Sequence, residues 1–272
     1  MQRPRLVASD VDGTLLGPME ALSDRTFDVL RRVEAAEVPF VLATGRPPRW
    51  IPPVAVPAQL TGYAVCANGA VLYDIAADRV VRVHGLDPLQ LGDIAHALEP
   101  VLPDMSLAAE RIAVGDPATG GDDVPFVTEL SYSNPWGNRE NHNVPRAEVT
   151  GRPAVKLLVR HHDMTSDEMA AIAREVLGEA FDITFSTGRG LIEVSAPGVT
   201  KATGLADAAA RLEVDPADVI AFGDMPNDVP MLKWAGQGVA MANAHPEALA
   251  AADEVTASNA EDGVAQVLER WF

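Results

Sequence analysis

Short apolar runs alternate with segments of helical periodicity along the outer parts of the chain. Apolar runs bounded by turn residues predict buried strands. They lie at Arg5–Ala8, Pro39–Ala43, Gly62–Cys66, Val71–Tyr73, Val80–Val83, Val219–Phe222 and Gly238–Met241. The helical pattern predicts helices at Ser23–Glu37, Lys201–Leu212, Val229–Ala235 and Pro246–Ala252. The segment Pro47–Pro57 is too rich in proline to predict a regular element.

The first predicted helix illustrates the pattern. Phe27, Leu30 and Val33 recur at helical spacing, and Ser23 is a suitable N-cap. Because strands and helices alternate in this way, we expect an α/β fold, a Rossmann-like core with a parallel sheet.

The pattern changes near residue 85. The middle of the chain predicts helices at Asp87–Leu98 and Ser166–Leu177. It also predicts strands at Leu107–Val114, Phe126–Ser131, Val155–Arg160, Phe181–Ser186 and Gly190–Ser195. These elements indicate an inserted α+β unit with a largely antiparallel sheet. We therefore expect a core of residues 1–84 and 191–272, split by an insertion at 85–190.

Composition narrows the class of protein. The chain has 272 residues, 47% of them hydrophobic, and no apolar run approaches the roughly 20 residues of a membrane span. Asp10 and Asp12 interrupt any signal-peptide pattern, and the lone Cys66 excludes an internal disulfide, so we expect a cytoplasmic protein. The net charge of -18 argues against a nucleic-acid partner. We expect a monomer or a homodimer.

Polar residues follow three of the predicted core strands directly. Asp10 and Asp12 come after the first strand, Thr44 after the second, and Asp224 and Asp228 after the strand near residue 220. In a parallel α/β sheet, residues just beyond the carboxyl ends of strands line the ligand crevice. These groups are therefore expected to converge on one rim.

The residue types at this rim suit phosphate chemistry. A carboxylate such as Asp10 is a competent nucleophile toward phosphorus, and a second one, Asp12, can act as acid and then as base. Gly13 allows a tight turn whose N–H groups face a phosphate. Asp and Gly are also common in surface turns, so this segment alone leaves both interpretations open.

The other two strand ends carry further candidates. The Thr44 hydroxyl can donate to a phosphate oxygen, and Gly45 permits close approach. Arg46 is as consistent with a structural salt bridge as with a role in the site. Asp224 can ligate a hard cation such as Mg²⁺, whereas Asp228 is expected to act through water or by orienting other groups. Asn227 is expected to bond near Lys201 or the phosphate.

Four segments in this order resemble the haloacid dehalogenase-like phosphatases, in their Cof-type branch (class IIB) with a large inserted cap. The segments are Asp10-Val11-Asp12-Gly13-Thr14, Thr44-Gly45-Arg46, Lys201 and Gly223-Asp224-Met225-Pro226-Asn227-Asp228. Two further stretches fit this branch, namely Ala67-Asn68-Gly69-Ala70 and Ala242-Asn243-Ala244-His245-Pro246-Glu247. The resemblance runs from near Leu6 to near Val267.

The resemblance implies Mg²⁺-dependent hydrolysis of a small phosphomonoester through a phospho-Asp10 intermediate. It implies a catalytic role for Asp10, Asp12 and Lys201. Phosphate binding falls to Asp12, Gly13, Thr44, Gly45, Lys201 and Asn227. Metal binding falls to Asp10, Asp12 through its backbone carbonyl, Asp224 and Asp228.

Several alternatives remain open at this point. The closest rival is a phosphomutase of the same fold, and a non-catalytic metal- or ligand-binding module is a rival from another class. The substrate is open among sugar phosphates, pyridoxal phosphate and flavin mononucleotide, because the insertion is expected to select it. Trp136 and Arg139, in the irregular stretch Asn134–Val144, are candidates for substrate contact or for anchoring that loop.

Overall fold

The computed structural model describes residues 2–111, 124–134, 137 and 140–272. The chain forms two compact units. The first combines Met1–Val83 with Val199–Phe272, and the second is the intervening segment His84–Gly198.

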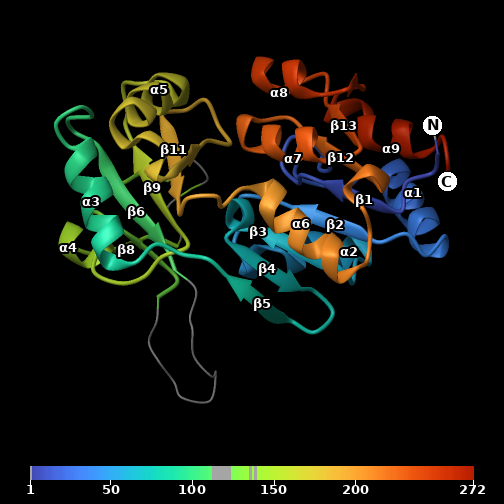
Figure 1. The fold of residues 1–272 in the computed structure, drawn as a ribbon, viewed down its shortest axis with the longest axis horizontal. Helices are drawn as coiled ribbons and strands as arrows, with labels where there is room; N and C mark the ends of the chain where they lie inside the picture. The colour runs from blue at the N-terminus through green and yellow to red at the C-terminus, as the bar shows by residue number, and fades with distance from the viewer. Residues whose placement is uncertain (1, 112–123, 135–136, 138–139) are drawn as a thin grey trace. The chain divides into compact units, whose positions relative to one another are not determined.

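The first unit contains an eight-stranded sheet of order β14-β13-β12-β1-β2-β3-β4-β5. Its strands are β1 (Leu6–Ser9), β2 (Phe40–Ala43), β3 (Tyr63–Cys66), β4 (Val71–Asp74), β5 (Arg79–Val83), β12 (Val219–Gly223), β13 (Gln237–Ala240) and β14 (Glu254–Val255). All neighbours pair in parallel except β3–β4 and β4–β5. Strand β1, blue in Figure 1, therefore lies beside β12 from the far end of the chain. The expected α/β core with a parallel sheet is confirmed.

Both faces of this sheet are covered. The helices of the unit are α1 (Asp24–Ala35), α2 (Pro52–Ala58), α6 (Lys201–Arg211), α7 (Val229–Trp234), α8 (Pro246–Ala251) and α9 (Gly263–Leu268). Leu6 and Ala8 pack in one apolar cluster with Leu205 of α6 and Met231 of α7. Val7 points to the opposite face, because side chains alternate along a strand, and it is also fully buried.

The start of α1 follows the expectation from sequence, and the helix ends at Ala35, two residues before the expected Glu37. The Ser23 side chain accepts a hydrogen bond from the backbone N–H of Thr26, so this serine is the N-cap. Val29, Leu30 and Val33 form the buried side of the helix. The capping bond satisfies an N–H that has no partner within the helix.

The prediction of no regular element at Pro47–Pro57 is wrong. A 3-10 turn at Pro48–Trp50 leads into α2. Pro52 and Pro53 occupy the first turn of α2, where N–H groups lack an intrahelical partner, so they remove no helix bond. The helix then ends after two turns, with Gln59 in the left-handed conformation.

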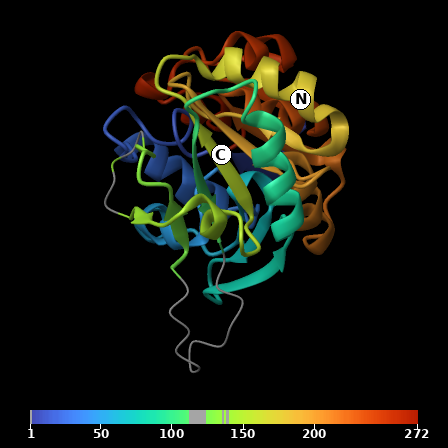
Figure 2. The ribbon, with the colours of Figure 1, turned by 90° about the vertical axis from the view of Figure 1, so that its left-hand side faces the viewer.

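The second unit has a six-stranded sheet of order β10-β11-β9-β6-β7-β8. Its strands are β6 (Ser106–Glu110), β7 (Phe126–Thr128), β8 (His142–Asn143), β9 (Lys156–Arg160), β10 (Asp182–Thr184) and β11 (Leu191–Ser195), and its helices are α3 (Pro88–Leu98), α4 (Arg146–Val149) and α5 (Ser166–Leu177). Pairing is antiparallel except between β7 and β8. Helices α3 and α5 pack together, as Figure 2 also shows.

The boundary between the units differs from the expectation. The sequence reading assigns residues 191–198 to the core. In the structure β11 pairs with β9 and β10, so it completes the sheet of the second unit, which ends at Gly198. The expected continuation of β6 to Val114 lies outside the described residues. Within the described part of the chain, no helix has the length and apolar character of a membrane span.

A close helix–turn contact sets the start of α6. A Cβ on Gly69 would lie 2.0 Å from the Thr200 carbonyl oxygen, and a Cβ on Gly204 would lie 2.4 Å from Val65 Cγ1. Only residues without a side chain permit this approach. The contact fixes the first turn of α6 against the turn that follows β3.

Substituting Gly204→Ala should lower the stability of the first unit by about 1–3 kcal/mol, because the added methyl group overpacks this contact. Gly92→Ala is the matched control, since Gly92 also lies inside a helix but a Cβ there meets nothing within 4 Å. The control should be neutral or stabilising by about 0.5–1 kcal/mol. Calorimetric unfolding of both variants checks this. Equal effects of the two substitutions would contradict the packing argument.

Candidate active site

The candidate site lies where the direction of strand connection reverses. From β1 the chain continues to β2 on one side, whereas β12 continues to β13 on the other, and β1 and β12 are neighbours. Asp10 follows β1 directly and Asp224 follows β12. In open α/β sheets such a switch point, at the carboxyl ends of the strands, is the usual place of a ligand crevice.

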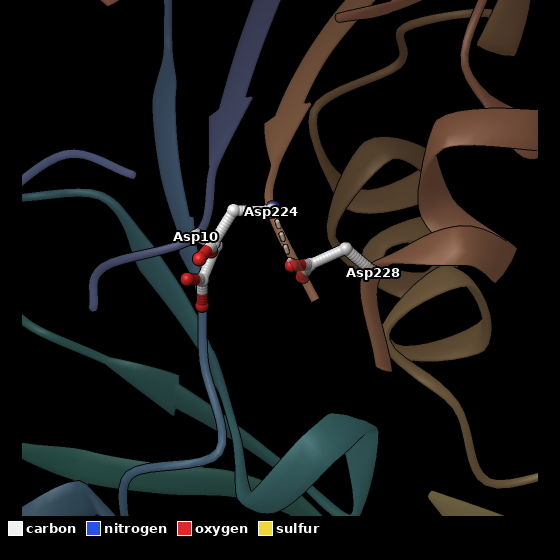
Figure 3. Close-up of side chains that lie close together, drawn as sticks. All are labelled: Asp10, Asp224 and Asp228. Carbon is white, nitrogen blue, oxygen red and sulfur yellow. Dashed lines mark hydrogen bonds between the residues drawn. The ribbon is translucent and has the colours of Figure 1, made fainter. Parts of the chain in front are cut away.

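Three carboxylates meet at this switch point. Asp10, Asp224 and Asp228 each offer an oxygen, and these oxygens lie within 4.8 Å of one another. All three side chains are buried. Figure 3 shows the carboxylates of Asp10 and Asp224 close together, with that of Asp228 directed toward the backbone of Asp224.

Lys201 joins two of these carboxylates. Its ammonium Nζ donates to Asp10 Oδ1 and to Asp228 Oδ1, each at 2.6 Å. The side chain is only 1% exposed, so burial would lower the pKa of Lys201. The charges of Asp10 and Asp228 outweigh burial and raise it, so the lysine is held as a cation.

Asp228 is fully engaged by the protein. Oδ1 accepts from Lys201, and Oδ2 accepts the backbone N–H groups of Asp224 and Met225, both at 2.9 Å. A Cβ on Gly223 would lie 2.5 Å from the Asp228 Cβ, so the glycine allows this side chain to fold under the loop. This geometry suits an orienting group.

Asp224 faces the turn that follows Asp10. Its Oδ1 accepts from the Thr14 hydroxyl at 2.9 Å. Gly13 has φ +79°, and a Cβ there would lie 2.3 Å from Asp224 Oδ2. The pKa of Asp224 is raised to about 7, first by burial and then by the negative charge of Asp228.

The donor set fits a hard cation. When all three carboxylates are ionised, they exceed the single ammonium group of Lys201 by two negative charges in a buried region. Burial is also the largest cause that raises the pKa of Asp10. Oxygen ligands of this kind are those that Mg²⁺ and similar ions take, so the buried Asp cluster could bind a metal ion.

The expected phosphate-binding residues lie around this cluster. Thr44 is buried, and its Oγ1 accepts the backbone N–H of Arg46 at 3.1 Å while its own hydroxyl hydrogen stays available. Gly45 is the partly exposed residue between them. Asn227 donates from Nδ2 to Asn68 Oδ1 at 3.1 Å, and no residue that the structure describes donates to its buried Oδ1.

Asp12 lies outside the buried cluster. Its side chain is 51% exposed, and Arg46 donates to both of its oxygens, at 2.8 Å from Nε and 2.5 Å from Nη2. Arg46 was predicted to form either a structural salt bridge or part of the site. The salt bridge is present, and its partner is Asp12, a predicted catalytic residue. Trp136 and Arg139 lie outside the described residues.

Sequence reasoning missed three residues that hold the site together. Thr14 bonds Asp224, and Asn68 bonds Asn227 from a left-handed conformation with φ 57°. Asn243 donates to the Gly13 carbonyl oxygen at 2.9 Å and accepts the N–H of Asn259 at 3.0 Å. Asn68 and Asn243 lie in the two stretches that resemble the Cof-type branch, and only the fold gives them partners.

A sequence model described as haloacid dehalogenase-like hydrolase matches residues 7–268. The match spans nearly the whole chain, so the chain belongs to this family. The resemblance drawn from the motifs and the expected enzyme class, a phosphatase of this family, are confirmed.

Two relatives illustrate the similarity. The 5-amino-6-(5-phospho-D-ribitylamino)uracil phosphatase YitU of Bacillus subtilis is 30% identical over 278 residues, covering 99% of this chain and 98% of the relative. A phosphoglycolate phosphatase of Methanothermobacter thermautotrophicus is 29% identical over 268 residues, covering 98% and 99% of the two chains.

Solved structures share the fold. SMU.1108c from Streptococcus mutans UA159 superimposes with a TM-score of 0.81 at 22% identity, covering 98% of each chain. A haloacid dehalogenase-like hydrolase from Bacteroides thetaiotaomicron gives a TM-score of 0.73 at 25% identity and covers all of both chains. The two-unit architecture therefore recurs in this family.

Substituting Asp224→Asn should stabilise the metal-free protein at pH 8 by about 2 kcal/mol. The folded-state pKa of about 7 exceeds the ordinary value of 3.8, so the unfolded chain loses its proton first and stability falls as pH rises between these values. The amide removes this cost, and its advantage should be smaller at pH 5.

Thermal unfolding in EDTA at both pH values measures the effect. Asp28→Asn, at an exposed position of α1, is the control and should leave the melting temperature nearly unchanged. A melting temperature of Asp224→Asn at or below that of the parent at pH 8 would contradict the assigned charge excess.

Proposed function

We propose that this protein is a Mg²⁺-dependent phosphatase that hydrolyses a small phosphomonoester through a phospho-Asp10 intermediate. The observation that carries the proposal is the Lys201 ammonium group, held at 2.6 Å from Asp10 beside the buried carboxylate of Asp224. A nucleophile, a fixed cation and a metal-ligand set in one buried cluster are what phosphoryl transfer needs.

We assign the metal to Asp10, Asp224 and the backbone carbonyl of Asp12. When bound there, Mg²⁺ supplies positive charge that offsets the negative charge of the phosphoryl oxygens. Asp228 is better assigned to orientation, because its two oxygens already accept from Lys201 and from two backbone N–H groups. It holds Lys201 and the loop that carries Asp224.

The first half of the reaction transfers the phosphoryl group to the protein. A carboxylate oxygen of Asp10 attacks phosphorus, and the bond between phosphorus and the ester oxygen breaks. The carboxyl group of Asp12 gives its proton to that oxygen, and the alcohol leaves. Lys201, Thr44 and Asn227, with the N–H groups at Gly13 and Gly45, hold the phosphoryl oxygens.

The second half releases phosphate. The Asp12 carboxylate takes a proton from water, and the water oxygen attacks phosphorus. The bond between phosphorus and Asp10 breaks, which restores the Asp10 carboxylate. Asp12 keeps the proton that it took from water and can act as the acid in the next cycle. Neither half requires a redox partner, and water is the co-substrate of the second half.

The substrate proposed is a phosphorylated sugar, polyol or cofactor. Every residue assigned above belongs to the first unit, so we assign chemistry to that unit and substrate choice to the second. Among relatives, one is named for 5-amino-6-(5-phospho-D-ribitylamino)uracil and another for phosphoglycolate, so these two compounds should head the assay panel.

The decisive experiment measures phosphate release from a panel of phosphometabolites, with Mg²⁺ and with EDTA. Asp10→Asn should abolish turnover of every substrate, because an amide cannot replace the carboxylate nucleophile. The variant should keep its fold, which circular dichroism checks. More than about 1% residual activity in pure Asp10→Asn protein would refute the phospho-Asp10 route, since loss of a nucleophile costs far more than a hundredfold.

Magnesium dependence should track Asp224 more than Asp228. Removing a direct ligand in Asp224→Asn should raise the Mg²⁺ concentration for half-maximal activity by about ten- to a hundredfold. In Asp228→Asn the maximal rate should fall more than the apparent metal affinity, because Lys201 loses its second anchor. Magnesium titrations of both variants decide the assignment, and the reverse order would overturn it.

A further inference from the structure

The Arg46–Asp12 pair lies at the edge of the site, and the proposed chemistry gives Arg46 no role. Arg46 Nε lies 2.8 Å from Asp12 Oδ2, and Nη2 lies 2.5 Å from Oδ1. The planar guanidinium therefore grips both oxygens at once, the bidentate geometry that fixes a carboxylate in position as well as in charge.

The two partners are held very differently by the rest of the protein. The Asp12 side chain is 51% exposed, whereas that of Arg46 is 16% exposed. Among the described residues, Arg46 is the sole side chain that donates a hydrogen bond to the Asp12 carboxylate. Without this grip, an exposed two-carbon side chain is free to sample several rotamers.

Arg46 itself is anchored by the backbone of the phosphate-binding loop. Its N–H donates to Thr44 Oγ1 at 3.1 Å, and its carbonyl oxygen accepts the N–H of Ala67 at 3.0 Å. The same loop thus carries Thr44, an expected phosphate-binding residue, and Arg46, which binds Asp12. Arg46, whose backbone is fixed by these bonds, therefore holds the exposed side chain of Asp12.

We propose that Arg46 is the positioning residue of Asp12 and fixes the acid/base carboxylate for proton transfer to the leaving oxygen. This inference rests on the proposed function, in which Asp12 is the acid and base. A carboxyl oxygen that carries a proton cannot also accept an N–H bond along the same direction. One Arg46 bond therefore opens when Asp12 carries the proton, and the other bond keeps the carboxyl group in reach.

The consequence is selective for the leaving group. Proton donation matters most when the leaving oxygen is strongly basic, as in phenyl phosphate, and least in p-nitrophenyl phosphate. The value of kcat/KM covers the steps through formation of phospho-Asp10, so it isolates the acid role of Asp12. We expect Arg46→Gln to lower kcat/KM by about tenfold or more for phenyl phosphate and by less than about threefold for p-nitrophenyl phosphate.

A double-mutant cycle shows whether Arg46 acts through Asp12. Arg46→Gln, Asp12→Ala and the double variant are assayed with both aryl phosphates at saturating Mg²⁺. In the Asp12→Ala background, Arg46→Gln should cause no further loss with phenyl phosphate. Arg46→Lys, which keeps the charge and loses the fork, should recover only part of the rate.

Arg25→Gln is the matched control. Arg25 also grips a carboxylate through Nε and Nη2, that of Glu269, at 3.0 and 2.5 Å, and it lies on α1 away from the Asp cluster. Arg25→Gln also removes a two-bond ion pair with a carboxylate, so it should leave both kcat/KM values unchanged. Melting temperatures of Arg46→Gln and Arg25→Gln should shift by similar small amounts.

The possible results distinguish failure of the positioning role of Arg46 from failure of the proposed function. A loss in Arg46→Gln that is equal for both substrates, or that persists in the Asp12→Ala background, overturns the positioning role and assigns Arg46 to phosphate binding or to folding. If Asp12→Ala itself shows no bias toward phenyl phosphate, the acid role of Asp12 fails, and with it the proposed function. If only Asp12→Ala shows the bias, the inference about Arg46 alone fails.

Discussion

The buried ammonium group of Lys201 is the interaction on which the site depends. It compensates part of the charge of Asp10 and Asp228, which could not otherwise be buried together at a tolerable free energy. Its position follows from packing: the close approach of Thr200 to Gly69 fixes the first turn of α6, and Lys201 opens that helix. The position of this buried charge thus rests on Gly69 and Gly204, two residues without side chains.

Lys201 compensates the negative charge only in part, because one ammonium group faces three carboxylates. The excess of negative charge favours a cation, so the cluster could bind a metal ion. In the metal-free protein, the buried excess of negative charge lowers the stability of the fold. The raised pKa values of Asp10 and Asp224 express the same fact, since each carboxylate favours any positive partner, a proton or a metal.

Much of this arrangement could be predicted from the sequence, because two local signals sufficed. Apolar runs identified the core strands, and the polar residues immediately after them marked one edge of a parallel sheet. Asp10, Asp224 and Asp228 come together as that pattern indicates. Lys201 joins them, but only the family resemblance placed it in the site. The side chain of Asp12 turns to Arg46, which strand position could not reveal, because the choice of partner depends on the course of another loop.

Other features were beyond a local reading. Helix α2 was missed because the prediction considered the number of prolines and not where they lie. Pro52 and Pro53 lie in the first turn of the helix, where a proline removes no helix hydrogen bond. The two-residue strand β14 and the six-residue helix α9 are too short for a periodicity to register. Thr14, Asn68 and Asn243 bond residues far along the chain, so their roles appear only after folding.

The order of elements has a consequence for synthesis on the ribosome. Strand β1 lies in the middle of the first sheet, yet one of its two neighbours, β12, begins only at Val219. The second unit is contiguous and can be complete while that neighbour is still unmade. During translation, β1 therefore remains unpaired on the β12 side until the whole second unit has been synthesised. Such late, long-range pairing makes folding slow and leaves the nascent chain open to aggregation.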